Sequence, residues 1–289
     1  MHLKPSLTAA VARLTANQVP SPRMNAELLL MFTLNCGRAH LYAHPERALS
    51  GEEQRRYDAA LAERSRGVPA QYITGHQEFW GLDLIVSPAV LIPRPETEHV
   101  IETVLELAGV ERAGGQASPL HKSHLRIADA GTGSGCIALA LAKELPQAEI
   151  HATDISAAAL EIARANAARL QVESHIQFRE ADLLAGFENN FFDFIVSNPP
   201  YVGESEEDQV QLEVRKFEPR NAVFSGPTGL EVIARLIPQA YAALKPGGWL
   251  VMEISGTIAE GVRRLLLDWN DVLIRRDLQS IPRVAQARK

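Results

Sequence analysis

Residues 197–201, Ser-Asn-Pro-Pro-Tyr, directly follow the apolar run 191–196 and are the first candidates for chemistry. Each Pro fixes its own φ angle, lacks a backbone N–H and favours extended geometry in the residue before it. The segment therefore holds its carbonyl groups outward as acceptors. The side-chain oxygen of Asn198 and the carbonyl of Pro199 can together accept both hydrogens of a planar NH2 group, and Tyr201 offers a ring face for a flat group. This arrangement suits methylation of an amide or amino nitrogen.

A glycine-rich turn at residues 131–135, Gly-Thr-Gly-Ser-Gly, lies between a predicted strand and a predicted helix. Glycines here permit positive φ angles, let a ligand approach the backbone and let the helix pack closely on the sheet. A nucleotide-like cofactor is therefore expected. The dinucleotide fingerprint places its third Gly three residues after the second, and this turn departs from that spacing, which favours adenosylmethionine over a dinucleotide. Taken alone, such a turn fits a purely structural role equally well.

Acidic residues follow the next two predicted strands. Asp154 ends the strand 150–153, where its carboxylate can accept hydrogen bonds from both ribose hydroxyls. Asp182, or the backbone beside it, follows the strand 175–179 and can meet the adenine edge. Because the carboxyl ends of parallel strands share one edge of a sheet, these residues, the glycine turn and Asn198 are predicted to face one crevice. This joint placement favours a functional role for the turn.

The elements that would position these residues alternate between strands and helices, which predicts an α/β fold with helices on both faces of a sheet. We expect a doubly wound, mostly parallel seven-stranded sheet that ends in an antiparallel pair. Residues 202–228 show no clear regular structure and are expected to form a functional or mobile loop. The predicted strands are residues 125–128, 150–153, 175–179, 191–196, 249–254, 272–276 and 283–287. The predicted helices among them are residues 136–145, 156–170, 229–244 and 258–269.

The chain is predicted to have three parts. Residues 1–69 form a small helical domain for substrate docking, residues 70–93 a β-hairpin linker, and residues 94–289 the methyltransferase domain. Residues 109–124, rich in Gly, Ser and His, are expected to be an exposed loop. The remaining predicted helices are residues 6–15, 23–35, 51–66 and 97–107.

Composition limits the possible functions. The 289 residues are 46% apolar and 22% charged, as in globular proteins, and no apolar stretch approaches the roughly 20 residues of a membrane span. Residues 1–19 lack the continuous apolar core of a signal peptide. Cys36 and Cys136 lie far apart without the spacing of zinc ligands, so neither a disulfide framework nor a metal site is predicted, and the cytoplasm is favoured. The net charge of −6 argues against binding nucleic acid through bulk electrostatics.

The glycine turn, Asp154 and residues 198–201 resemble the class I adenosylmethionine-dependent methyltransferases that modify planar nitrogens. More narrowly, residues 69–75, 78–81 and 91–98 resemble the release-factor glutamine methyltransferases, the HemK/PrmC family. The resemblance implies a helical N-terminal domain and a hairpin before the catalytic domain. It implies S-adenosylmethionine as cofactor and peptide-chain release factors as partners, methylated on the side-chain N5 of the glutamine in their Gly-Gly-Gln loop. It implies neither a nucleic-acid nor a membrane partner.

The resemblance also assigns residues by position. Two positions depart from the family: Leu183 stands where some members have Trp, and Thr257 where a Gln is frequent. The candidate cofactor-binding residues are Gly131, Thr132, Gly133, Ser134, Gly135, Asp154, Asp182, Leu183 and Asn198. The candidate substrate-binding residues are Asn198, Pro199, Pro200 and Tyr201. The candidate catalytic residues are Asn198, Pro199 and Tyr201.

Two other functions fit parts of this pattern. The Asn-Pro-Pro-Tyr segment would suit the exocyclic amino group of adenine or guanine equally well, and such an enzyme would flip the base into a pocket. A nucleic-acid enzyme should carry a basic face or a target-recognition domain, whereas acidic residues outnumber basic ones after residue 70. The other alternative is an inactive, cofactor-binding adaptor that docks on the translation machinery, and the intact turn and tetrapeptide argue against it.

Several charged residues have plainer interpretations. Glu96 and Glu98 are expected to charge the first turn of a helix. His121 and His124 are expected to face solvent rather than a metal ion. Arg94, between two prolines, is a more pointed candidate because a rigid bracket fixes it, but it comes second to the tetrapeptide.

Overall fold

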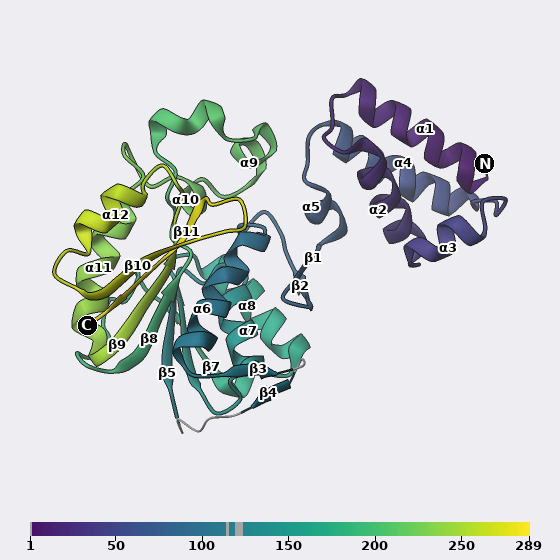
Figure 1. The fold of residues 1–289 in the computed structure, drawn as a ribbon. Helices are drawn as coiled ribbons and strands as arrows, with labels where there is room; N and C mark the ends of the chain where they lie inside the picture. Colours follow the sequence, from purple (N-terminus) through teal and green to yellow (C-terminus); the bar gives the residue numbers. More distant parts are fainter. Residues whose placement is uncertain (1, 114–115, 119–123) are drawn as a thin grey trace. The chain divides into compact units, whose positions relative to one another are not determined.

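The computed structural model describes residues 2–113, 116–118 and 124–289. The chain divides into two units (Figure 1). We call Met1–His76 with Gln211–Phe217 the helical unit, and Gln77–Val210 with Glu218–Lys289 the sheet unit. Every helix in the described part of the chain is too short or too polar to pass through a bilayer.

The helical unit is held together by an apolar core that includes Leu14, Leu29 and Leu30, each fully buried. Its longest helix begins at a capping box in which Ser50 and Glu53 exchange hydrogen bonds, as expected for a Ser followed three residues later by Glu. The predicted helices of this region are confirmed. The helices are α1 (Leu3–Ala16), α2 (Pro22–Leu34), α3 (Arg38–Ala43), α4 (Gly51–Ser65), α5 (Ala70–Thr74) and α9 (Leu212–Phe217).

Residues 70–74 fall in the predicted hairpin of residues 70–93 but form α5, so the hairpin was predicted too long. The amides of Tyr72 and Ile73 donate to the carbonyl of Pro69, and Gly75 ends the helix with a φ of 76°. Ile73 packs against the core of the helical unit. Burial of this side chain therefore outweighs the strand preference of the run Tyr-Ile-Thr.

The sheet unit is built on a seven-stranded sheet in the order β10-β11-β9-β8-β5-β6-β7 (Figure 1). The strands β5 to β9 are parallel to one another, whereas β11 is antiparallel to both β9 and β10. The predicted doubly wound, mostly parallel seven-stranded sheet is confirmed. The strands are β5 (Arg126–Ala130), β6 (Glu149–Asp154), β7 (Ile176–Glu180), β8 (Phe192–Ser197), β9 (Leu244–Glu253), β10 (Asn270–Arg276) and β11 (Pro282–Arg288).

Two short strand pairs accompany the main sheet. The first joins β1 (His76–Phe79) to β2 (Leu82–Ile85) and confirms the predicted hairpin with its turn at Gly81. The second joins β3 (Glu111–Ala113) to β4 (Gln116–Ser118), within a segment that we expected to be a loop. His121 lies outside the described residues.

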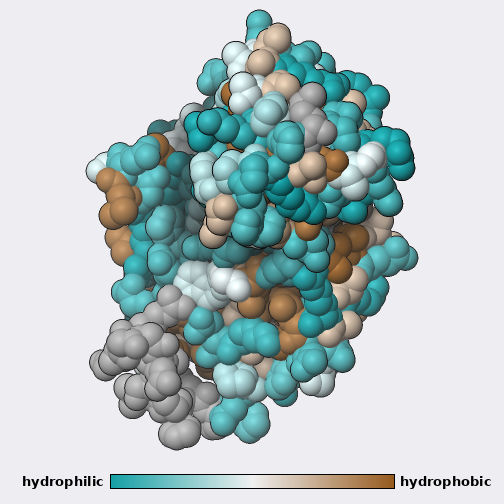
Figure 2. All heavy atoms as spheres, turned by 90° about the vertical axis from the view of Figure 1, so that its right-hand side faces the viewer, coloured by the Kyte–Doolittle hydropathy of each residue, from teal (hydrophilic) through white to brown (hydrophobic). Residues whose placement is uncertain are grey.

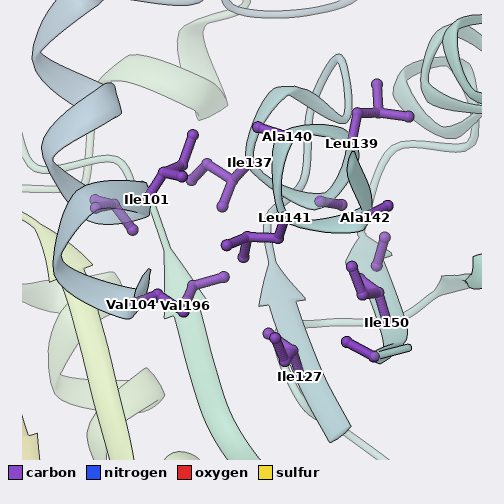
Figure 3. Packing of buried hydrophobic residues seen from close by; sticks show 14 of the residues in the cluster. Ile101, Val104, Ile127, Ile137, Leu139, Ala140, Leu141, Ala142, Ile150 and Val196 are labelled. Atoms are coloured by element: carbon purple, nitrogen blue, oxygen red, sulfur yellow. The ribbon is translucent and has the colours of Figure 1, made fainter. Parts of the chain in front are cut away.

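Helices cover both faces of the main sheet, because alternate strand residues point to opposite sides. Ile127 joins the apolar cluster on one face and Ala128 the cluster on the other. Figure 3 shows Val104 of α6 beside Val196 of β8, and Ile101 of α6 beside Ile137. On the first face lie α6 (Glu98–Leu107), α7 (Cys136–Glu144) and α8 (Ala157–Leu170), and on the second α11 (Glu231–Ala243) and α12 (Ala259–Leu265).

The order of the strands reverses between β5 and β8, which are hydrogen-bonded neighbours although β6 and β7 lie between them in sequence. Ligand sites in open α/β sheets form at such a switch point, beyond the carboxyl ends of the strands. A crevice for a ligand is therefore expected where β5 and β8 end.

On the face drawn in Figure 2, hydrophilic residues predominate and hydrophobic ones are restricted to a few areas.

Residues 202–228 are more regular than we predicted. They contain η3 (Glu204–Gln209), α9 and α10 (Arg220–Val223). The amide of Val202 donates to the carbonyl of Val223 over 3.1 Å, and the amide of Ser225 donates to the carbonyl of Val202 over 2.9 Å. The expectation of an irregular loop was wrong because helices of four to six residues are too short for apolar periodicity to reveal them.

Candidate active site

The glycine turn leaves β5 with positive φ angles of 74°, 56° and 85° at Gly131, Gly133 and Gly135. A Cβ added at Gly131 or Gly133 would meet no atom within 4 Å. At Gly135 it would lie 3.2 Å from the Cβ of Ala163 in α8. The first two glycines thus leave the backbone open to a ligand, and the third permits close helix packing.

Side chains at the ends of β5 and β6 hold this turn in shape. The Thr132 hydroxyl donates to Asp129 Oδ2 over 2.6 Å, and the amide of Ala138 donates to the same oxygen over 3.2 Å. The amide of Gly133 donates to Asp154 Oδ2 over 2.9 Å. Burial raises the pKa of Asp129 to about 7, because an ionised carboxylate is disfavoured away from water.

The ends of β6 and β7 place three predicted residues in different settings. Asp154 also accepts a hydrogen bond from the amide of Ser156 over 2.9 Å, and burial raises its pKa. Leu183 is 9% exposed and has a positive φ of 55°. Asp182 forms an ion pair of 2.5 Å with Arg235 of α11, so its carboxylate already has a partner.

A cavity of about 320 Å³ lies where these strand ends meet. Four of the predicted residues do not line it: Ser134, Gly135, Pro199 and Tyr201. The lining also contains residues that sequence reasoning missed, most of which come from segments far in sequence from the glycine turn and share no pattern with it. The predicted residues that line it are Gly131, Thr132, Gly133, Asp154, Asp182, Leu183, Asn198 and Pro200. The lining residues that were missed include Val90, Thr97, Ile155, Asn221 and Phe224.

The Asn-Pro-Pro-Tyr segment begins where β8 ends. The Ser197 hydroxyl donates to the carbonyl of Ala130 over 2.6 Å, which joins this end of β8 to the end of β5. Asn198 and Pro200 line the cavity, and Pro199 is buried beside them. The structure therefore brings the glycine turn and the polar segment to the same cavity, as predicted.

Two buried residues, Thr97 and Glu253, connect the polar side chains of this segment, and sequence reasoning gave neither a role. Each is 1% exposed. The Thr97 hydroxyl donates to Glu253 Oε2 over 2.6 Å, and Asn198 Nδ2 donates to Thr97 Oγ1 over 3.1 Å. The Tyr201 hydroxyl donates to Glu253 Oε1 over 3.0 Å. Burial raises the pKa of Glu253, and the only sequence signal was an acidic residue at the end of an apolar strand.

Arg94 forms an ion pair with Glu218, whose side chain is 1% exposed. The same carboxylate accepts a hydrogen bond from the amide of Ile92 over 3.1 Å. Glu218 comes two residues before α10, and Phe224, directly after α10, lines the cavity. The pair therefore fixes the Pro-Arg-Pro bracket to a segment that borders the cavity, which gives Arg94 a structural role.

Glu96 forms an ion pair with Arg283, with 3.7 Å between Glu96 Oε1 and Arg283 Nη2.

Two family models match the sequence, the PrmC N-terminal domain over residues 6–75 and the methyltransferase small domain over residues 117–216. A release factor glutamine methyltransferase of Koribacter versatilis is 54% identical over 290 residues, with 100% of this chain and 99% of that protein covered. The chain belongs to the release factor glutamine methyltransferase family. The predicted family and class of enzyme are thus confirmed.

Other members of the release factor glutamine methyltransferase family are similar over nearly the same length. One from Xylella fastidiosa is 40% identical over 284 residues and covers 98% of both chains. One from Rhodopirellula baltica is 38% identical over 275 residues and covers 93% of this chain and 90% of its own. Among solved structures, the hMettl16 catalytic domain in complex with MAT2A 3'UTR hairpin 6 has a TM-score of 0.56 at 18% identity, covering 79% of this chain and 81% of that one. This last likeness supports the methyltransferase fold alone.

Proposed function

We propose that this chain transfers a methyl group from S-adenosylmethionine to the side-chain N5 of the glutamine in the Gly-Gly-Gln loop of peptide-chain release factors. The observation that carries the proposal is the full-length similarity to a protein named release factor glutamine methyltransferase, at 54% identity. The site supports it, because the glycine turn and Asn198 border one cavity.

The residues of the cavity fit S-adenosylmethionine. Its volume of about 320 Å³ lies within the range of small-molecule sites. The open backbone at Gly131 and Gly133 leaves room for the cofactor to approach the turn. Asp154 uses both carboxylate oxygens for backbone amides, yet each oxygen keeps a lone pair for a ribose hydroxyl. Leu183 offers an apolar side chain to the adenine ring in place of an aromatic one.

The chemistry depends on placing a poor nucleophile. The lone pair of a carboxamide nitrogen is delocalised into its carbonyl, and its protons are too weakly acidic for removal before attack. The bound cofactor would supply an electrophilic methyl group. Asn198 Oδ1 and the Pro199 carbonyl would accept the two amide hydrogens, direct the nitrogen at that methyl group and stabilise the positive charge that grows on the nitrogen. The new N–C bond would form as the S–C bond breaks, which would leave the cofactor as a neutral thioether, and the proton would pass last to water, without a strong general base.

The two units would have different functions. The helical unit, which contains the matched PrmC N-terminal domain, would dock the release factor, and the sheet unit would carry out the transfer. We place the enzyme in the cytoplasm, where release factors act on ribosomes. Tyr201 would hold the amide plane of the substrate glutamine by van der Waals contact.

The proposal is tested by incubating the protein with methyl-labelled S-adenosylmethionine and one of several acceptors. These are a purified release factor, the same factor with the loop glutamine replaced by alanine, duplex DNA, and RNA. We expect label on the intact factor alone. Label on DNA or RNA, or equal label on the alanine variant of the factor, would contradict the proposal.

A further inference from the structure

Thr97 lies between Asn198 and Glu253 and is hydrogen-bonded to both, and the direction of each bond follows from elementary donor and acceptor chemistry. When Glu253 is ionised, its carboxylate can only accept hydrogen bonds, so the Thr97 hydroxyl donates its single proton to Glu253 Oε2, 2.6 Å away. Thr97 Oγ1 is then left to accept. The group that faces it at 3.1 Å must be the NH2 of Asn198 rather than its oxygen.

This chain of hydrogen bonds decides which end of the Asn198 amide serves the substrate. Asn198 lines the cavity, and with its NH2 group held by Thr97 its acceptor, Oδ1, remains for a ligand. Rotating the amide by 180° would point the NH2 group at the ligand, where it could not accept a hydrogen bond from a second NH2 group. A side chain that selects an amide nitrogen must therefore be kept in one of two nearly isosteric orientations.

We propose that Thr97 and Glu253 are positioning residues that lock Asn198 with its side-chain oxygen directed at the methyl-accepting nitrogen. The same carboxylate accepts the Tyr201 hydroxyl over 3.0 Å, so one buried acidic group orients both ends of the Asn-Pro-Pro-Tyr segment. Thr97 lines the cavity and Glu253 does not, and we assign neither a contact with the reacting atoms. The inference rests on the proposed transfer to glutamine and adds the device that makes the site select NH2 groups.

The main test is Thr97→Val, which removes the hydroxyl and keeps the shape of the side chain. We expect turnover of release factor to fall about 10- to 100-fold, as when an orienting partner of a functional side chain is removed. The dissociation constant for S-adenosylmethionine should change less than about twofold, because the turn and Asp154 are untouched. Thr97→Ser keeps the hydroxyl and should be at least about tenfold faster than the valine variant.

A matched control is Thr103→Val in α6. Thr103 is 2% exposed, like Thr97 it is a buried Thr, and its hydroxyl donates only within its helix, to the carbonyl of His99. We expect turnover within about twofold of the unaltered protein and a melting temperature shifted as in Thr97→Val. Equal turnover of the two valine variants would overturn the proposal.

A second variant and a double-mutant cycle separate positioning from stability. In Glu253→Gln one carboxylate oxygen becomes an NH2 donor, so the side chain can no longer accept from both Thr97 and Tyr201, and a loss of about 10- to 100-fold is expected here too. In an Asn198→Ala background, Thr97→Val should lower turnover less than about threefold further, since its effect acts through Asn198. The same fold loss in both backgrounds would overturn the inference, as would normal turnover of Glu253→Gln.

The outcomes for the unaltered protein distinguish the two proposals. If it labels no release factor, the proposed function fails, and this inference fails with it. If it labels the factor and Thr97→Val labels it equally well, only the positioning role fails. If the valine variant does not fold, the comparison of Thr97→Ser with Glu253→Gln decides.

Discussion

Asn198 connects the cavity to the buried hydrogen bonds of Thr97 and Glu253. Its side chain lines the cavity and donates to Thr97. We expect Asn198→Ala to lower turnover by a factor of about 100 or more, since it removes an oriented hydrogen bond that strengthens in the transition state. Binding of S-adenosylmethionine should stay largely intact in a calorimetric titration. Near-normal turnover would show that the acceptor role is wrong.

At the scale of single residues, the sequence predicted the cavity-lining residues that belong to compact motifs. Gly131, Asp154 and Asn198 were predicted because each stands at the end of a recognisable strand, and all three line the cavity. Thr97 and Glu253 could not be predicted in the same way. Their hydrogen bond joins residues 156 positions apart, and only the folded chain brings them together. The roles of all these residues in binding and catalysis stay predictions.

At the scale of elements, the side chain of Asn166 ties α8 to two other segments. Asn166 is fully buried, and its Oδ1 accepts from the amide of Ile85 in β2 over 2.7 Å. Its Nδ2 donates to the carbonyls of Ile85 and Ser134, both over 3.0 Å. One side chain thus fixes the hairpin and the glycine turn to the same helix.

Asn166→Ala leaves three backbone groups without partners. We expect the free energy of unfolding to fall by about 2–4 kcal/mol, at roughly 1 kcal/mol for each unsatisfied group, and the affinity for S-adenosylmethionine to fall with it. Urea denaturation and a calorimetric titration measure the two effects. Asn17→Ala, at an exposed position with one side-chain hydrogen bond in α1, should cost less than about 1 kcal/mol. Equal costs for the two variants would contradict this account.

The sequence predicted the long elements better than the short ones. The strands β5 to β8 were found within one or two residues of their bounds. Of these, β5, β6 and β8 are buried parallel strands, which read as mainly apolar runs, whereas β7 is an edge strand that is partly exposed. Strand β9 begins at Leu244, five residues before the predicted start, because Pro246 and two glycines hid its first half. The short helices α3, α5, α9 and α10 were missed, since tertiary contacts rather than local periodicity determine them.

At the scale of the whole molecule, residues 211–217 are part of the helical unit although they are inserted in the sequence of the sheet unit. Arg64, whose side chain is 4% exposed, pairs with Glu213 of α9 over 2.7 Å. Arg64 also donates to Asn25 Oδ1 and to the carbonyl of Val68. The predicted domain boundaries treated each domain as one continuous stretch, and no local pattern reveals an inserted segment of this kind.

Removing the partner of a buried guanidinium should destabilise the helical unit. We expect Glu213→Gln to lower its free energy of unfolding by about 2 kcal/mol, the loss of one charge-assisted hydrogen bond. Glu260→Gln removes an exposed i,i+4 pair with Arg264 and should cost less than about 0.5 kcal/mol. Hydrogen exchange of the amides in α4 measures the effect, and equal protection in the two variants would contradict it.

The position of α9 in the sequence also affects when the helical unit can finish folding while the chain is being synthesised. Residues 1–76 leave the ribosome first, but the carboxylate that neutralises Arg64 is encoded more than a hundred residues later. At about 5–20 residues per second, the first part of the helical unit waits on the order of 10 s for its last helix. The helical unit is therefore completed only after much of the sheet unit has been synthesised, and it cannot finish folding strictly in the order of translation.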